Sequence, residues 1–178
     1  MFQDIAQYPF LKPLEDRWAE ILAELTALTR DRFADWPERE IYRGDWSVFG
    51  LHAFGLRMDE NCGACPVTAA CVEAVPGLAT AAFSTLAPGT HITPHKGYTG
   101  TILRCHLGLI TPPDCALRVG DETRAWEAGK ALVFDDTTEH EAWNRGSSTR
   151  TVLLVDFKRD PDRELSLDDL PPWLNPFT

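Results

Sequence analysis

The sequence has no apolar run that approaches the length of about 18 residues that a membrane-spanning helix requires. Its first residues, Met1-Phe2-Gln3-Asp4, lack the basic segment and the apolar core of a secretion signal. We therefore expect a cytoplasmic protein that does not bind membranes.

Basic residues are also scarce, because 17 Lys plus Arg stand against 27 Asp plus Glu and give a formal net charge of −10. A chain of this charge repels nucleic-acid backbones and anionic lipid surfaces, so we expect neither as its main partner. The 44% of hydrophobic and 25% of charged residues are ordinary for a globular protein and exclude general disorder. A length of 178 residues fits a single domain.

The cysteines do not indicate a disulfide framework. The five cysteines are an odd number, and without a secretion signal we expect reduced thiols. Cys62, Cys65 and Cys71 form a Cys-x2-Cys-x5-Cys pattern, but a zinc site would need a fourth ligand. We favour packed or surface thiols over structural zinc.

The first third of the chain contains one amphipathic helix, which we expect from about residue 13 to about residue 32. Its apolar positions recur at helical spacing, at Trp18, Ile21, Leu22, Leu25 and Leu28. Residues 46–57 favour extended chain. A second, short helix is expected at about 67–75, where Pro76-Gly77 ends it.

From residue 79 onward, short apolar stretches alternate with turn residues, a pattern typical of a sandwich or a closed jelly roll. The segment 151–157 is almost entirely apolar, which indicates a central strand. Beyond Arg159 the chain is rich in Pro, Asp and Leu, and we expect either a segment that wraps around the domain or a loose end.

The segment 101–109 alternates in a way that assigns two faces to a strand. Cys105 shares an apolar face with three leucines, whereas Arg104 and His106 share the opposite face. If that second face lines a barrel interior, both side chains would bind an anionic group. The alternative is a surface face of an edge strand.

Two histidines, His95 and His140, stand at the ends of expected strands. Imidazole is the most common ligand of first-row metals, and two imidazoles would leave most coordination positions open for substrates. Their spacing alone is weak evidence for a metal site. Trp126 and Trp143 are interpreted as core aromatics.

Several short motifs follow one another in order between residues 83 and 156. They are Pro88-Gly89-Thr90-His91 with Pro94-His95-Lys96-Gly97, Leu103-Arg104-Cys105-His106-Leu107-Gly108-Leu109, Leu117-Arg118-Val119-Gly120, Trp126-Glu127-Ala128-Gly129-Lys130, Phe134-Asp135-Asp136, His140-Glu141-Ala142-Trp143-Asn144, and Arg150 before the apolar strand. Gly44-Asp45-Trp46 is a weaker match upstream. In this order and spacing, the stretch resembles the aspartyl/asparaginyl β-hydroxylase family of iron(II)- and 2-oxoglutarate-dependent oxygenases.

The resemblance implies a mainly β fold with flanking helices, a double-stranded β-helix of the cupin-like jelly-roll type. It agrees with the strand and turn pattern. We expect one domain over residues 1–178, with a helical N-terminal segment at about 1–45, a β-helix core at about 46–158 and a C-terminal tail at 159–178.

The resemblance also implies a metal site and a co-substrate site. His95 and His140 would hold Fe(2+), while Gly97 stands where many related oxygenases carry a carboxylate ligand. Asp136 would lie beside the metal without ligating it. Arg150 would pair with the distal carboxylate of 2-oxoglutarate, which Ser84 and His106 would also bind by hydrogen bonds.

The substrate follows less directly from the resemblance. Arg104 matches an arginine that holds the carboxylate of an acidic substrate residue, but Ile102 replaces a second arginine of animal members. We expect a dioxygenase that uses O2 to hydroxylate an unactivated carbon of an aspartyl/asparaginyl-like residue or a small amino-acid-derived substrate with a carboxylate or amide. Succinate and CO2 would be the co-products. The alternatives are a cupin-like isomerase, a non-catalytic metal-binding barrel and an iron(II) halogenase.

Overall fold

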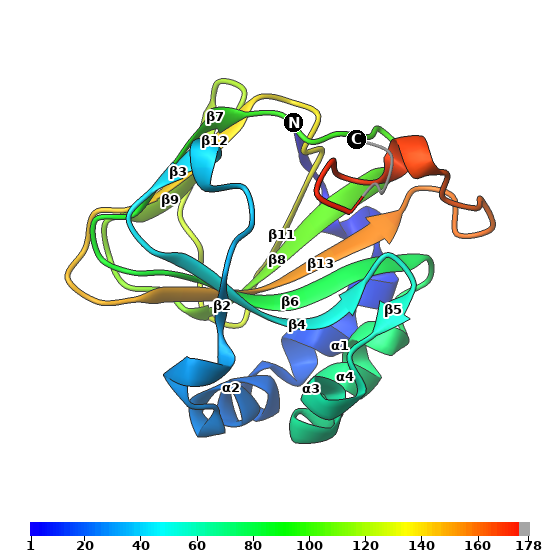
Figure 1. Ribbon diagram of the computed structural model, residues 1–178, viewed down its shortest axis with the longest axis horizontal. Coiled ribbons are helices and arrows are strands. Elements are labelled where there is room, and N and C mark those ends of the chain that lie inside the picture. Colours follow the sequence, from blue (N-terminus) through cyan, green and yellow to red (C-terminus); the bar gives the residue numbers. More distant parts are fainter. Residues whose placement is uncertain (175–178) are drawn as a thin grey trace.

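Two antiparallel β-sheets face each other and enclose the interior of the molecule (Figure 1). The computed structural model describes residues 1–174. The larger sheet has eight strands in the order β1-β11-β8-β13-β6-β4-β2, with β5 paired to β4, and the smaller has five in the order β10-β9-β12-β7-β3. This arrangement is a double-stranded β-helix, the predicted cupin-like jelly roll.

The strands are β1 (Phe2–Gln3), β2 (Ala34–Asp35), β3 (Tyr42–Arg43), β4 (Trp46–Ala53), β5 (Leu56–Arg57), β6 (Leu78–Leu86), β7 (His91–His95), β8 (Ile102–Ile110), β9 (Cys115–Val119), β10 (Glu122–Arg124), β11 (Ala131–Phe134), β12 (His140–Asn144) and β13 (Arg150–Lys158). The α-helices are α1 (Lys12–Asp16), α2 (Trp18–Ala27), α3 (Asp59–Ala64) and α4 (Pro66–Glu73). Short 3-10 turns lie at Ile5–Gln7, Pro9–Leu11, Arg30–Arg32, Arg39–Ile41 and Leu167–Asp169.

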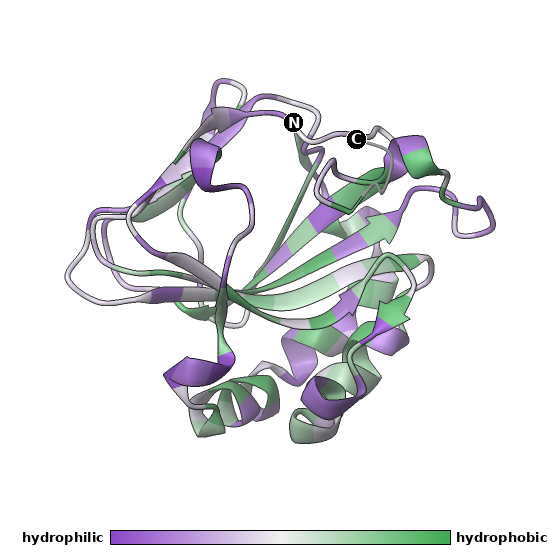
Figure 2. Ribbon diagram, in the orientation of Figure 1, coloured by the Kyte–Doolittle hydropathy of each residue, from purple (hydrophilic) through white to green (hydrophobic). Residues whose placement is uncertain are grey.

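The four helices cover the outer face of the larger sheet (Figure 1). Figure 2 shows hydrophobic residues both on these helices and along the strands above them. Strand alternation explains the apolar core between the larger sheet and the helices. Every second residue of β8 points toward the helices, and Leu103, Cys105 and Leu107 are completely or almost completely buried there. The predicted faces of this strand and the core-facing Cys105 are therefore confirmed.

A second apolar cluster fills part of the space between the two sheets. The larger sheet contributes Leu86, Phe134 and Val152, and the smaller sheet contributes Ile92 and Leu117. The predicted central strand at 151–157 is confirmed, because β13 pairs with β6 on one side and β8 on the other. Burial on both faces explains its nearly continuous apolar sequence.

The prediction of one helix at about 13–32 is wrong in two respects: the helix is interrupted, and it ends earlier. Arg17 leaves the helical conformation at φ −107° and ψ 14°, which separates α1 from α2. Leu28 is extended at φ −77° and ψ 141°, so α2 ends at Ala27. Leu28 nevertheless packs against the core. The apolar spacing in the sequence therefore extends beyond the last residue of the helix, which is why the predicted helix was too long.

Two further differences concern the segments around this layer. The helix predicted at about 67–75 begins earlier, at Pro66, and α3 precedes it, although the sequence analysis did not predict α3. The N-terminal segment is also not purely helical, because β1 pairs with β11 and β3 pairs with β7. Such two-residue strands carry no readable alternation, so their pairing depends on the rest of the sheet.

The described part of the tail, residues 159–174, wraps around the domain. Arg159 donates its backbone N–H to the carbonyl oxygen of Thr101. Asp169 accepts hydrogen bonds from the hydroxyls of Thr99 and Thr101, each at 2.6 Å. Residues 175–178 of the predicted tail lie outside the described residues. Within residues 1–174, no helix combines the length and the hydropathy needed to cross a membrane.

Candidate active site

Two imidazoles meet on the smaller sheet. His95 ends β7 and His140 begins β12, and the antiparallel register pairs them directly, with ring centroids 4.2 Å apart. Each Nδ1 lies close to a backbone carbonyl oxygen two residues earlier, at 2.8 Å from Thr93 and 2.9 Å from Thr138. These carbonyls can only accept, so each Nδ1 carries the proton and each Nε2 keeps its lone pair.

Burial keeps both rings neutral. It lowers the pKa of His95, and together with the neighbouring His95 ring it lowers the pKa of His140 to about 3. A neutral imidazole with a free Nε2 is the form that ligates a metal ion. The structure thus brings together the two predicted iron ligands in a form suited to that role.

Asp136 occupies the place beside Gly97. A Cβ atom at position 97 would lie 2.3 Å from Oδ2 of Asp136, and the backbone N–H of Gly97 donates to the carbonyl oxygen of Asp136 at 2.8 Å. Burial raises the pKa of Asp136 to about 6, and its Oδ1 has no hydrogen-bond partner. The ligand atoms of Asp136, His95 and His140 do not all lie within 4.8 Å of one another.

Arg150 is buried without a carboxylate partner among the described residues. It begins β13, is 1% exposed, and donates from one terminal nitrogen to the carbonyl oxygen of Ser84 at 3.1 Å. Its guanidinium lies 4.5 Å from the ring centroid of Trp126, and its Nε has no partner. Burial lowers the pKa of Arg150 to about 9. The side chain is cationic at neutral pH, and within residues 1–174 a carbonyl oxygen and an aromatic ring face it but no carboxylate pairs with it.

His106, on β8, offers a second buried donor near this cation. Its Nδ1 accepts a hydrogen bond from the indole Nε1 of Trp126 at 3.3 Å, which places the ring proton on Nε2. That Nε2 is buried and has no partner, while burial and the charge of Arg150 hold the pKa of His106 well below its usual value. Ser84 is also buried, and its hydroxyl accepts from the indole N–H of Trp46 at 3.0 Å.

The co-substrate candidates and the histidine pair converge from opposite sheets. Ser84, His106 and Arg150 come from β6, β8 and β13 of the larger sheet, whereas His95 and His140 come from the smaller sheet. The ring of Phe134 links the two groups, with its centroid 5.1 Å from that of His106 and 5.4 Å from that of His140.

Arg104 differs from Arg150 in having a carboxylate partner among the described residues. It donates from Nε and one terminal nitrogen to the two carboxylate oxygens of Asp156, at 2.7 and 2.8 Å. The same guanidinium lies 3.8 Å from Asp136. A bidentate pair of this kind neutralises the guanidinium in place. Asp156 was not among the predicted site residues, although its charge on the apolar strand β13 is a signal of a buried partner.

A pocket of about 410 Å³ opens beside the histidine pair and reaches His95, Arg104 and Asp136. Apolar side chains form much of its wall, and they include Trp36, Trp46, Phe54, Met58, Ile102 and Trp173. Trp36 stacks on Trp46 with ring centroids 4.3 Å apart, and Trp173 of the tail meets Trp36 edge-on at 6.0 Å. The pocket is therefore concave and aromatic, and His95, one of the two candidate metal ligands, borders it.

A family model described as aspartyl/asparaginyl beta-hydroxylase matches residues 15–160, which include the histidine pair and the candidate co-substrate residues but not Trp173 of the pocket wall. The chain belongs to the aspartyl/asparaginyl β-hydroxylase family. The predicted resemblance is thereby confirmed, and the chain is a member of a family of hydroxylases.

Two relatives illustrate the range of the family. The ornithine lipid ester-linked acyl 2-hydroxylase of Rhizobium tropici is 40% identical over 166 residues, which cover 86% of this chain and 59% of the relative. The human aspartyl/asparaginyl beta-hydroxylase is 39% identical over 155 residues, which cover 82% of this chain and 20% of the relative. The chain thus spans less than two thirds of the length of either relative.

Among solved structures, a cupin 2 conserved barrel domain protein from Rhodopseudomonas palustris aligns with a TM-score of 0.46 at 11% identity. The alignment covers 74% of this chain and 72% of that protein. A likeness of this size carries no argument about function.

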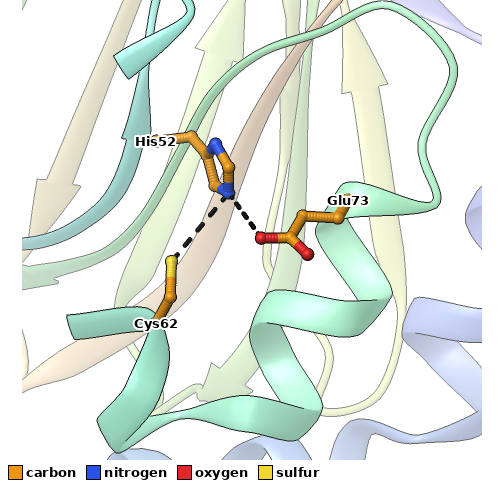
Figure 3. Close-up of side chains that lie close together, drawn as sticks. All are labelled: His52, Cys62 and Glu73. Atoms are coloured by element: carbon orange, nitrogen blue, oxygen red, sulfur yellow. Dashed lines mark hydrogen bonds and ion pairs between the residues drawn. The ribbon is translucent and has the colours of Figure 1, made fainter. Parts of the chain in front are cut away.

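The three upstream cysteines do not form a metal site of their own. All three are buried free thiols, in agreement with the interpretation as packed thiols. Within residues 1–174, one group of three or more His, Cys, Asp or Glu ligand atoms lies close together, and it joins Cys62 to His52 and Glu73 (Figure 3). Cys65 and Cys71 are outside it.

Trp126 was predicted as a core aromatic, and it also contacts two residues of the candidate site. It is buried, but it also orients His106 and lies against the guanidinium of Arg150. Trp143 is half-buried, with Arg145 over its ring. The only sequence signal for the role of Trp126 was its place in the family motif, because β alternation cannot be read in the loop that carries it.

Proposed function

We propose that this chain is an iron(II)- and 2-oxoglutarate-dependent dioxygenase that hydroxylates an unactivated carbon, with succinate and CO2 as co-products. The observation that carries the proposal is the buried guanidinium of Arg150, which has no carboxylate partner in the described part of the chain. Burying a charge without a partner is costly, so a chain that retains one needs an anion to complete the site. The distal carboxylate of 2-oxoglutarate has the required charge and planar shape.

The donor set fits the co-substrate. Besides Arg150, the unpartnered Nε2–H of His106 would donate to a co-substrate oxygen, and the hydroxyl of Ser84 offers a further polar contact. Trp126 fixes the tautomer of His106 that makes Nε2 the donor. These groups satisfy an anion without supplying a competing negative charge.

The donor set of the histidine pair likewise fits Fe(2+), because two neutral imidazoles present free Nε2 atoms held by their backbone hydrogen bonds. Bound iron would supply the activation of O2 that is coupled to decarboxylation of 2-oxoglutarate. The chain itself orients the two imidazoles, holds the co-substrate carboxylate and surrounds the site with apolar walls that exclude water. No residue needs to act as a general base.

We infer that the substrate presents a neutral, largely apolar group to the pocket. A substrate carboxylate at Arg104 would have to displace Asp156 from a bidentate pair, and it would meet a second carboxylate, that of Asp136, 3.8 Å from the same guanidinium. The aromatic wall of Trp36, Trp46 and Trp173 suits an acyl chain or an amide-linked apolar group. The relative from Rhizobium tropici is named for hydroxylation of an acyl chain.

An anaerobic titration tests the proposal. Metal-free protein receives Fe(2+) and then 2-oxoglutarate, and the visible charge-transfer band of a 2-oxoglutarate–iron chelate is recorded. We expect a band that His140→Ala abolishes, and we expect Arg150→Ala to weaken 2-oxoglutarate binding at least tenfold. The controls are His91→Ala, which removes a half-exposed imidazole from the same strand as His95, and Arg124→Ala, which removes an exposed arginine.

Bound iron without the band would refute the use of 2-oxoglutarate and favour the metal-binding barrel or the isomerase. With turnover established, mass spectrometry of the product separates hydroxylation from the chlorination that a halogenase would perform.

A further inference from the structure

A second group of metal-binding side chains lies outside the candidate active site. It consists of His52 near the end of β4, Cys62 in α3 and Glu73 at the end of α4 (Figure 3). Sequence spacing did not reveal it, because the three residues come from three elements. Only the packing of α3 and α4 under the sheet brings them together.

The distances match one face of a coordination tetrahedron. Nε2 of His52 lies 3.1 Å from Oε1 of Glu73 and 3.9 Å from Sγ of Cys62, and all three ligand atoms are within 4.8 Å of one another. With ordinary zinc–ligand bond lengths, tetrahedral angles give nitrogen–oxygen and nitrogen–sulfur separations of about 3.4 and 3.6 Å. Shifts of about 0.3 Å would bring both distances from His52 to these values.

We propose that His52, Cys62 and Glu73 bind a divalent ion of the zinc type, with a water molecule in the fourth position. An imidazole, a thiolate and a carboxylate suit Zn²⁺, whereas the all-nitrogen histidine pair of the active site offers no sulfur. Binding replaces the thiol proton of Cys62, which passes to the solvent, and the two anionic ligands then balance the charge of the ion.

Arg57 is the group that competes with the metal, and its geometry is compatible with binding. Its Nε donates to Oε1 of Glu73 at 2.8 Å, and another of its nitrogens donates to Asp59. The same Oε1 lies 3.1 Å from Nε2 of His52, and a carboxylate oxygen has two lone pairs, so Oε1 can accept from Arg57 with one and ligate the ion with the other. Ligating carboxylates are commonly held by such a hydrogen bond.

The expected consequence is a cross-link between the sheet and the helical layer. An ion at this place would join β4 to α3 and α4, which are otherwise held mainly by apolar packing. His52 and Met58 also line the pocket, so the ion would stiffen one part of the pocket wall. This role is separate from the proposed oxygenase chemistry, and its test does not depend on activity.

Cobalt(II) titration of the reduced, metal-free full chain tests the site, because a cobalt–thiolate bond gives a near-ultraviolet charge-transfer band. We expect this band in the unmodified protein and in His140→Ala, which lacks a ligand of the other site. Cys62→Ser should lose it, whereas Cys71→Ser, which removes another buried thiol, should keep it. His52→Gln should weaken cobalt binding at least tenfold.

Zinc should also raise the thermal midpoint of His140→Ala but not of the double variant His140→Ala/His52→Gln, since the ion stabilises only the state that binds it and the shared His140→Ala change removes the histidine pair. Glu73→Gln, with a partly exposed side chain, supplies a second test if Cys62→Ser does not fold. Absence of the thiolate band at saturating cobalt, or a band that survives Cys62→Ser, would overturn the proposal. Neither result would bear on the histidine pair.

Discussion

The carboxylate of Asp136 fills the space beside Gly97 that a side chain at position 97 would need. A Cβ atom there would lie 2.3 to 2.5 Å from three atoms of that carboxylate group. Glycine at position 97 therefore has two effects. It leaves the segment His95-Lys96-Gly97 without a carboxylate at its third residue, and it leaves room for the carboxylate of Asp136, which lies in the connection between β11 and β12.

Gly97→Ala should consequently destabilise the protein by about 1–3 kcal/mol, the range typical of overpacking. Asp136→Ala should relieve the clash, so that the double variant is less unstable than the sum of the two single variants. Urea unfolding of the four proteins measures the coupling, for which contacting residues give about 0.5–3 kcal/mol. Additive costs would show that the two residues do not compete for space.

Arg150→Met should separate stability from co-substrate binding. The substitution removes a buried charge that has no carboxylate partner, so the ligand-free variant should be at least as stable as the unmodified protein. In the presence of Fe(2+), 2-oxoglutarate should raise the thermal midpoint of the unmodified protein but not that of the variant. A variant that is clearly less stable without ligand would mean that another group already compensates Arg150.

Asp156→Ala should have the opposite effect on stability. It leaves the guanidinium of Arg104 buried without its bidentate partner, and breaking such a pair typically costs about 3–5 kcal/mol. Asp160→Ala, an exposed acidic residue on the same segment, is the matched control. Asp156→Asn, which keeps the shape of the side chain, should increase binding of carboxylate-bearing compounds to the pocket. If it does not, Arg104 is not accessible to substrates.

Asp169 should make the attachment of the tail dependent on pH. Burial raises its pKa, but hydrogen bonds from Thr101, Thr99 and Ser166 outweigh burial and hold the pKa well below the usual value. A carboxyl with a lowered folded-state pKa contributes stability above its unfolded pKa of about 3.9 and loses that contribution as the pH falls toward the folded value. Asp169→Asn should therefore lower the thermal midpoint at pH 7.

The difference between the two proteins should shrink when thermal midpoints are compared below about pH 4. Ser166 and Thr99 remain in both proteins, so the comparison isolates the charge of Asp169. A gap that is constant from pH 7 to pH 3 would assign the effect to packing instead.

The sequence by itself determined the jelly-roll class and the course of its central strands. In β8 and β13, long apolar runs and strict alternation leave few arrangements, because each residue must face either the helices or the interior. The ordered motifs also indicated one protein family, and the resemblance to that family singled out a set of site residues: His95, His140, His106, Ser84 and Arg150. A match of this length depends on many residues together and does not require knowledge of their contacts.

Only the tertiary structure decided the contacts between residues distant in sequence. The pairing of Arg104 with Asp156 depends on the register between β8 and β13, and that of Asp136 with Gly97 depends on how β7 and β12 meet. The end of α2 at Ala27 is also a tertiary effect, because Leu28 leaves the helix and still packs, half-buried, against the core. The local sequence shows which side chains are polar or charged. Which hydrogen-bond or ion-pair partner each of them meets depends on how distant segments pack together.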